Sequence, residues 1–324
     1  MNFLPAHELL PYYQYKKQQA VPFDPKAIAN LPDNIRDQFK KEASTGYEEF
    51  LIAFKNPCII EPKSGWVLTE DFRTIAESRP YGRSVLPEFL PAITAGQYDE
   101  VSKVQIEEAV VLYEGCENYF HFLNEFVGRL ILLDQLGVPR DIPIIIPEKM
   151  KEITFVNQFF DLLPDLFSRN WVYQPPDVFY RIKKCTYLVQ VMKHNRRNLA
   201  SLAEGSSAAV EDFHKADQDL HLFITRSKIS GRGLLNMDKI EAVALKHGFT
   251  IIDPEQESVE KQIKLFSRAR HVIGPHGAGN VNLVFRGDKP LKLLEIFPEN
   301  FIKGTYFFYV RILAMSTRHY WEAP

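Results

Sequence analysis

HVIGPHGAGNVN, residues 271–282, carries the strongest local signal of the sequence. Its first residues predict a buried strand, and a glycine-rich loop leads from this strand into a helix. Small residues let a backbone approach a ligand closely, and the free N–H groups at a helix start bind anions. The candidate residues of such an anion site are His276, whose ring can donate a further hydrogen bond, Gly277, Ala278 and Gly279.

The glycine spacing argues against two common nucleotide sites. It is not the GxGxxG of a dinucleotide-binding fold, and the sequence has no GxxxxGK[ST] phosphate loop, so a dehydrogenase and an ATPase are disfavoured. Taken alone, the spacing fits an anion site and a turn that needs small residues for packing about equally well. Other segments have to decide between them.

Outward from this stretch, strand-like and helix-like segments alternate along most of the chain. We expect one unit with strands at 107–115, 142–147, 170–174 and 179–189 and helices at 118–137 and 149–163. We expect a second unit with strands at 220–226, 249–254, 271–275 and 291–297 and helices at 236–247 and 258–269. Such alternation predicts an α/β protein with parallel sheets, divided by a linker near 198–213.

The two ends of the chain are less regular. Residues 1–56 predict short helices and loops that cover a sheet edge. Residues 58–62 and 66–70 flank a turn signal and predict two short neighbouring strands. Apolar residues at helical spacing predict a terminal helix over about 304–324.

A basic loop favours the anion site over simple packing. Arg226, Lys228 and Arg232 follow the strand at 220–226 with no acid among them. In parallel α/β sheets ligands bind beyond the carboxyl ends of the strands, where this loop and the glycine-rich loop both begin. Arginine forks fit phosphate oxygens, although three basic residues alone would also suit a solvated surface. We therefore expect a phosphate-binding site at this edge.

Glu295 is a lone acid at the end of the last predicted strand. It could accept a hydrogen bond from a ribose hydroxyl or form a salt bridge to an arginine. The pair Asp217 and Asp219 precedes its strand rather than following it, so we interpret it as a solvated linker and not as a metal site.

Composition limits the range of functions. The chain has 324 residues, 45% hydrophobic and 25% charged, with a net charge of −2, so no global field attracts nucleic acid or an anionic membrane. Cys58, Cys116 and Cys185 are far apart, which predicts free buried thiols rather than disulfides or a zinc site.

The sequence gives no sign of membrane insertion. We see no signal peptide and no run of 18 apolar residues, so we expect a cytoplasmic protein without a transmembrane segment. Residues 181–197 contain a basic run that could contact an anionic acceptor or the inner membrane surface. An alternating strand followed by a solvated loop explains the same run, and we favour that interpretation.

Six short motifs, in order, resemble glycosyltransferase family 61. They are ENYFHFLNE (117–125), ITRS (224–227) with Arg232 and Asn236, GFTIIDPE (248–255), QIKLFSRA (262–269), PHGAG (275–279) followed by Asn282, and LLEIFP (293–298). The resemblance covers roughly residues 105–300. The sequence departs from it at residues 279–282, where the family often has a bulkier residue after the small one.

The resemblance implies a GT-B-like architecture with two Rossmann-like domains facing a central cleft. Residues 1–200 would form the acceptor-binding domain and 201–324 the nucleotide-sugar-binding domain, with the terminal helix packing back on the first. It also implies inversion at the anomeric carbon, no obligatory metal or cofactor, a UDP-sugar donor, and a glycan or lipid-linked glycan acceptor in polysaccharide, capsule or lipopolysaccharide synthesis. The donor-binding residues it implies are Arg226, Ser227, Arg232, Asn236, His276, Gly277, Ala278, Gly279, Asn282 and Glu295.

Inversion requires a general base for the acceptor hydroxyl. His121 and Glu125 are four residues apart and share one face of the helix predicted at 118–137, so the carboxylate could orient the imidazole. A structural histidine between two phenylalanines and Glu125 as the base itself are the alternatives. Asn118 suits a helix cap.

Three rival functions define the alternatives. A nucleotide-sugar epimerase would need no acceptor, and a phosphorylase would consume free phosphate. A non-catalytic glycan-binding relative would not turn over a donor. A nucleic-acid-binding protein would need a basic surface that this composition lacks.

Overall fold

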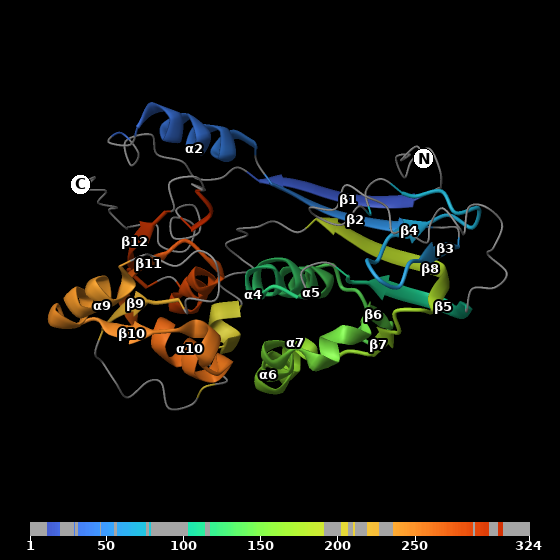
Figure 1. Ribbon diagram of the computed structural model, residues 1–324. Helices are drawn as coiled ribbons and strands as arrows, with labels where there is room; N and C mark the ends of the chain where they lie inside the picture. Colours follow the sequence, from blue (N-terminus) through green and yellow to red (C-terminus); the bar gives the residue numbers. More distant parts are fainter. Residues whose placement is uncertain are drawn as a thin grey trace. The chain divides into compact units, whose positions relative to one another are not determined.

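The protein is described by a computed structural model (Figure 1). The structure describes residues 12–19, 29, 32–45, 47–54, 57–75, 78, 103–113, 117–190, 202–206, 210, 219–226, 236–287, 289–297 and 304–306. The chain divides into two compact units. The first comprises Met1–Gln18, Glu48–Asn157 and Pro164–Met192, and the second comprises Gln19–Tyr47, Gln158–Leu163 and Lys193–Pro324.

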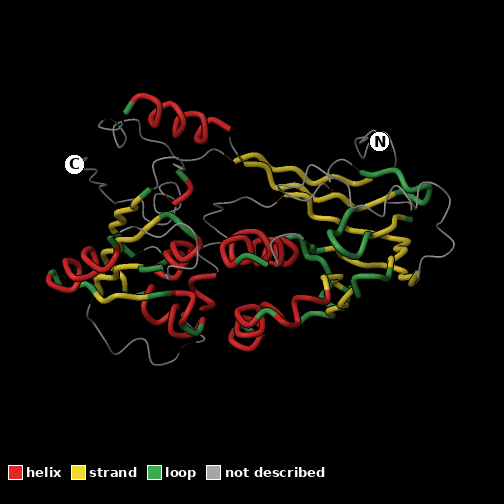
Figure 2. The backbone as a smooth tube through the Cα atoms, viewed as in Figure 1, coloured by secondary structure: helices red, strands yellow, loops and turns green. Residues whose placement is uncertain are grey.

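The first unit is built on a sheet of eight described strands, seen as yellow tubes in Figure 2. Its strands are β1 Tyr12–Gln19, β2 Tyr47–Phe54, β3 Cys58–Ile60, β4 Val67–Leu68, β5 Lys103–Val111, β6 Ile144–Pro147, β7 Trp171–Gln174 and β8 Phe179–Gln190. The main order is β1-β2-β8-β5-β6-β7, with β3 beside β8 and β4 beside β3.

This sheet is mixed, which corrects the prediction of a parallel sheet. Strands β5, β6, β7 and β8 are parallel, as the alternation predicts. The other edge of the long strand β8 pairs antiparallel with β2 and then with β3, and β3 and β4 form the predicted pair of short strands. The expectation of helices and loops for residues 1–56 is wrong for β1 and β2 and right for helix α2, Asp33–Thr45.

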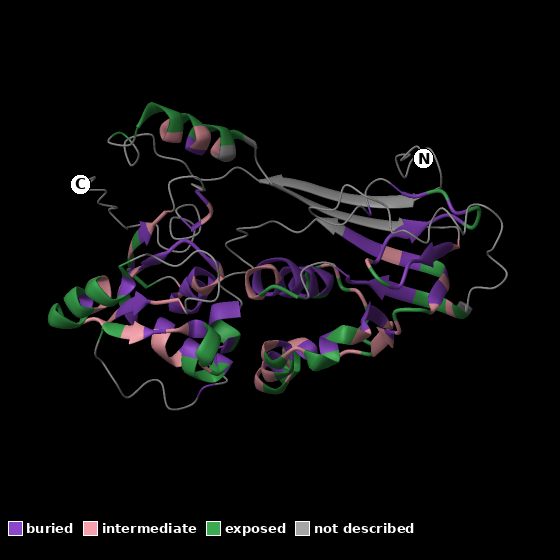
Figure 3. Cartoon of the chain, viewed as in Figure 1, coloured by how far each residue is buried: buried purple, intermediate pink, exposed green. Residues whose placement is uncertain are grey.

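One continuous helical run connects β5 to β6. It consists of α4 Tyr119–His121, the π-helical turn η4 Phe122–Phe126 and α5 Val127–Gln135. Residues 122–133 are all buried, and most of the run is purple in Figure 3. It ends before Gly137, whose φ of 68° closes the helix as the sequence predicts. Three shorter helices, η5 Glu148–Glu152, α6 Thr154–Leu162 and α7 Pro164–Phe167, lie between β6 and β7 in the chain.

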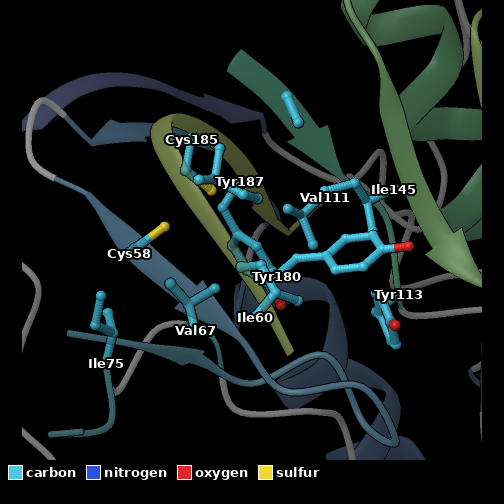
Figure 4. Close-up of a cluster of buried hydrophobic side chains, with 12 residues drawn as sticks. Cys58, Ile60, Val67, Ile75, Val111, Tyr113, Ile145, Tyr180, Cys185 and Tyr187 are labelled. Atoms are coloured by element: carbon cyan, nitrogen blue, oxygen red, sulfur yellow. The ribbon is translucent and has the colours of Figure 1, made fainter. Parts of the chain in front are cut away.

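The core of the first unit is a cluster of buried hydrophobic side chains (Figure 4), and a buried hydrogen-bond network starts from its Tyr113. The Tyr113 hydroxyl donates to Gln174 Oε1 at 2.6 Å, and Gln174 Nε2 donates to the carbonyl of Ile60 at 3.1 Å. The network joins the ends of β5 and β7 to β3. In the same core Cys58 and Cys185 are buried and free, as predicted, and burial raises the pKa of the Cys58 thiol. Cys116 lies outside the described residues.

The second unit contains a sheet in which all four described strands are parallel, in the order β10-β9-β11-β12. The strands are β9 Leu220–Ile224, β10 Thr250–Ile252, β11 Ala269–Pro275 and β12 Lys292–Ile296, and between them lie α9 Met237–Lys246, η8 Pro254–Gln256, α10 Val259–Phe266 and the 3₁₀ helix η9 Ala278–Arg286. This confirms the alternation predicted for this half of the chain. Of the predicted terminal helix, only residues 304–306 lie in the described part.

Candidate functional site

The order of the second sheet places a reversal point between β9 and β11. From β9 the chain crosses to β10 on one side, whereas from β11 it crosses to β12 on the other. Ligands of open α/β sheets bind at such a reversal point, beyond the carboxyl ends of the strands. Arg226 follows β9 here, and His276 follows β11, with its backbone N–H donating to the carbonyl of Ile296 at 2.8 Å. The structure thus brings two of the predicted segments to one edge.

Arg226 lies directly against the glycine-rich loop. Its Nη1 is 3.4 Å from the carbonyl oxygen of His276, and a Cβ atom at Gly277 would lie only 2.7 Å from the same nitrogen. Its Nη2 is 3.9 Å from a carboxylate oxygen of Glu255, and its side chain is 12% exposed. These are the only hydrogen bond and ion pair of the guanidinium within the described part of the chain. Since a guanidinium has five N–H donors, most of its binding capacity is unused.

Beneath the loop, His276 is held by a buried carboxylate. His276 Nδ1 is 2.6 Å from Glu295 Oε1, and Asn280 Nδ2 donates to the carbonyl of Pro275 at 3.1 Å and lies 3.5 Å from the same carboxylate oxygen. The His276 ring stacks on Phe297, with the ring centroids 5.4 Å apart. Burial raises the pKa of Glu295, while the hydrogen bonds from His276 and Asn280 act in the opposite direction. The network fixes the loop from below.

Glu295 lies beneath the loop, where its ionic partner among the described residues is a histidine. Its side chain is 3% exposed and its carboxylate contacts His276 rather than the arginine of the salt-bridge interpretation, while the ribose contact stays a prediction. Register explains this, because Glu295 pairs with Gly274 in the sheet, one residue before the strand ends. The carboxylate therefore orients His276.

Two glycines serve packing. A Cβ atom at Gly274 would lie 2.8 Å from Ile224 Cβ, and one at Gly279 would lie 3.0 Å from Pro254 Cγ. Packing thus accounts for these two small residues, whereas Gly277 makes room for the Arg226 guanidinium. Ala278 and Gly279 begin η9, whose first N–H groups have no partner within the helix.

The remaining residues predicted to bind the donor differ in how far they are buried. Asn282 is fully buried, and its Nδ2 donates to Gln262 Oε1 at 2.7 Å, while Gln262 in turn donates to the carbonyl of Pro254. This side chain supports the loop around η8 from within. Asn236 is exposed at the start of α9, without a side-chain cap bond. Ser227, Lys228 and Arg232 lie outside the described residues.

The candidate base lies in the first unit. Asn118 caps the helical run by accepting from the N–H groups of Phe120 and His121, as predicted. His121 Nδ1 is 2.8 Å from Glu125 Oε1, and the side chains are 30% and 8% exposed respectively. Glu125 belongs to the π-helical turn, in which Val127 N–H donates to Phe122 C=O. Such turns occur frequently at functional sites. An accessible imidazole with a carboxylate on Nδ1 can accept a proton at Nε2.

Asp219, which the sequence places in a solvated linker, has partners within the second unit. Asp219 is not simply solvated, because its carboxylate forms salt bridges with Arg270 and Arg286, each at 2.9 Å. It therefore anchors the amino-terminal end of the second sheet. Asp217 lies outside the described residues.

The described part of the basic run is paired with acids. Its three cations form salt bridges as follows: Arg181 with Glu70, Lys183 with Glu107, and Lys184 with Glu108. This supports the interpretation as an ordinary alternating strand for residues 181–190. Residues 191–197 are not described.

Sequence reasoning missed two neighbours of the site. Asn280 was hidden among the small residues of the loop, although an asparagine in the first helical turn after a glycine-rich loop is a usable signal. Glu255 follows β10 at the same sheet edge, but a search for basic residues overlooks an acid that faces Arg226. Both contacts depend on the strand order.

Comparison with known proteins identifies the family. The sequence model described as Glycosyltransferase 61 matches residues 119–291, more than half of the chain. The chain belongs to the glycosyltransferase 61 family. It is therefore a glycosyltransferase, and the family match includes His121, Arg226 and the glycine-rich loop.

Comparisons of this glycosyltransferase with curated proteins and with solved structures give no further information about its site. No curated protein matches the chain. A solved structure with a similar arrangement is the dodecameric iron-containing heptosyltransferase TibC in complex with ADP-D-beta-D-heptose, at 10% identity and a TM-score of 0.34, covering 76% of this chain and 75% of that one. TibC from enterotoxigenic E. coli H10407 gives the same identity and TM-score, covering 76% and 74%. Likeness at this level carries no argument about the site.

The described part of the chain contains neither a cluster of metal ligands nor a membrane-spanning helix. Among the described residues, no three His, Cys, Asp or Glu side chains gather as metal ligands would. No helix within the described ranges is both long and apolar enough to span a bilayer.

Proposed function

We propose that the protein is an inverting, metal-independent glycosyltransferase that moves a sugar from a nucleoside diphosphate donor to a glycan hydroxyl. The donor proposed is a UDP-sugar, and the product would be part of a polysaccharide, capsule or lipopolysaccharide. The proposed arrangement is GT-B-like, with residues 1–200 binding the acceptor and 201–324 binding the donor. The family resemblance suggests the base of the nucleotide and the acceptor class.

The observation that carries the proposal is the state of the Arg226 guanidinium. It is largely withdrawn from solvent, yet it makes one long hydrogen bond and one distant ion pair with the described residues. A buried donor group without good partners is unfavourable, so a ligand that supplies acceptor oxygens gains from it. A diphosphate offers such oxygens and matches the guanidinium fork. Each charge-assisted hydrogen bond would contribute about 1.5–3 kcal/mol.

The glycine-rich loop would stabilise the leaving diphosphate. When the bond to the anomeric carbon breaks, negative charge develops on the diphosphate, and fixed donors aimed at that charge lower the barrier. The free N–H groups at the start of η9 and the Arg226 guanidinium can supply these donors at one sheet edge. His276, held by Glu295, would keep the loop in this shape.

The proposed general base is His121. Glu125 would hold Nδ1 and stabilise the imidazolium, while Nε2 takes the proton of the acceptor hydroxyl as its oxygen attacks the anomeric carbon. The partial exposure of His121 leaves its ring reachable by a substrate. We expect His121→Ala to lower turnover, and Arg226→Ala and His276→Ala to weaken donor binding.

Calorimetric titration with UDP tests the donor site. We expect Arg226→Gln to raise the Kd for UDP about 10- to 100-fold, because the substitution removes a charge-assisted contact. Arg270→Gln is the matched control, since Arg270 lies at the amino-terminal end of β11 and pairs with Asp219. Equal affinity of the wild type and Arg226→Gln would overturn the assignment. Conversion of a nucleotide sugar to its epimer without any acceptor would point to an epimerase instead.

A further inference from the structure

Asn124 is a buried side chain with unmet hydrogen-bonding capacity. It is 3% exposed, and neither Oδ1 nor Nδ2 has a hydrogen-bond partner within the described part of the chain. A carboxamide can donate two hydrogen bonds and accept two. Leaving both ends unsatisfied in a protein interior is unfavourable, so each such group calls for an explanation.

The other buried asparagines of the described chain are bonded. Asn282 donates to Gln262, and Asn280 donates to the carbonyl of Pro275. Asn280 still has an unpaired Oδ1, but its amide nitrogen is satisfied. Among the buried asparagines that the structure describes, Asn124 is thus the one with both ends unpaired.

The unpaired carboxamide of Asn124 lies beside the proposed general base. Asn124 lies in the π-helical turn η4, three residues after His121 and next to Glu125. Residues three apart on a helix are neighbours on its surface. The turn departs from regular α geometry only across residues 122–126, the same residues that contain Asn124 and Glu125. The irregular backbone and the unpaired side chain therefore coincide beside the proposed base.

We propose that Asn124 is a specificity-determining residue that binds a pair of sugar hydroxyls beside the His121–Glu125 pair. This inference rests on the proposed function, because it assigns a sugar substrate to that site. Adjacent hydroxyls of a sugar ring offer one acceptor and one donor, which the Nδ2 and Oδ1 of a single carboxamide match. The unfavourable burial of Asn124 in the free protein would then be relieved when the substrate binds.

The test replaces Asn124 with leucine, which has nearly the same shape and no polar atoms. A functional side chain that is unsatisfied in the free protein should be replaceable without loss of stability, so we expect the Tm of Asn124→Leu to equal or exceed that of the wild type. We expect kcat/KM for sugar transfer to fall about 30- to 100-fold. Asn282→Leu is the matched control, because it leaves the bonded Gln262 Oε1 unpaired and should lower the Tm by several degrees.

Two reactions, UDP-sugar hydrolysis and sugar transfer, show whether Asn124 binds hydroxyls of the donor sugar or of the acceptor. Loss of UDP-sugar hydrolysis without acceptor would assign the contact to the donor sugar, whereas unchanged hydrolysis with a raised acceptor KM would assign it to the acceptor. A higher Tm with unchanged transfer would overturn the inference, because the unpaired side chain of Asn124 would then have no role in the reaction. A Tm lowered as much as that of Asn282→Leu would also overturn it, since Asn124 would then hold a structural water. If the wild type transfers no sugar from any of a panel of nucleotide sugars, the proposed function fails and this inference fails with it.

Discussion

Gly277→Ala separates the binding role of the glycine-rich loop from its packing role. Gly277 has a φ of 172°, an extended conformation that alanine adopts freely, so the backbone is not strained by the change. The new methyl group would lie 2.7 Å from Nη1 and 3.0 Å from Cζ of Arg226. These atoms end a flexible side chain, so the guanidinium can move away from the loop. The substitution therefore displaces the arginine without disrupting the fold.

The size of the effect follows from the contacts that are lost. A displaced guanidinium loses a charge-assisted bond to the diphosphate, about 1.5–3 kcal/mol, which corresponds to roughly 10- to 150-fold in Kd. The free energy of unfolding should change by less than about 0.5 kcal/mol, as for substitutions that break no packed contact. Gly274→Ala gives the contrast, because its methyl group would meet Ile224 Cβ at 2.8 Å and a backbone oxygen at 3.3 Å. Overpacking of this kind costs about 1–3 kcal/mol.

Calorimetric titration with UDP and thermal unfolding together measure both quantities. We expect Gly277→Ala to keep the wild-type Tm and to bind UDP at least tenfold more weakly. We expect Gly274→Ala to lose several degrees of Tm. Wild-type UDP affinity in a folded Gly277→Ala protein would refute the role given to Arg226.

Three further predictions concern charge, pH and packing. Glu255→Gln should tighten UDP binding several-fold by calorimetry, because Glu255 competes with the diphosphate for Arg226; weaker binding would contradict this. Burial and the nearby His221 lower the pKa of His271, so its contribution to stability is full above about pH 6.5 and is lost as the pH falls through the lowered pKa. His271→Phe should therefore flatten the decline of Tm between about pH 7 and pH 5, and a parallel decline would refute it. Gly65→Ala should lower the Tm strongly, because Gly65 has a φ of 75° and its Cβ would lie 2.2 Å from Tyr113; an unchanged Tm would argue against this packing.

The second unit could be predicted closely because its signals are local. Each strand there is a short apolar run between helices with clear ends, such as α10, which Ser258 caps by accepting from Lys261 N–H. The parallel order follows from that alternation. The strands β1 and β2 could not be predicted in the same way. Residues 12–19 read YYQYKKQQ, without the alternation that marks a strand, and β2 is defined by pairing with β8 more than 130 residues later.

The individual residues of the candidate site could be predicted from the sequence, but most contacts between them could not. The four-residue spacing of His121 and Glu125 is local, and the structure places their side chains in contact. Glu295 and His276 are 19 residues apart, and only the register of β11 against β12 shows that they meet. The contact between Glu255 and Arg226 likewise depends on the neighbouring strands β9 and β10. Pairing between strands is long-range information that a single sequence does not express.

A crystal structure of the protein with UDP is the most direct measurement of the donor site. We expect the two linked phosphates at the carboxyl edge of the second sheet, with their oxygens within hydrogen-bonding distance of the Arg226 guanidinium and of the N–H groups that begin η9. A diphosphate bound elsewhere, with Arg226 still facing Glu255, would contradict the account.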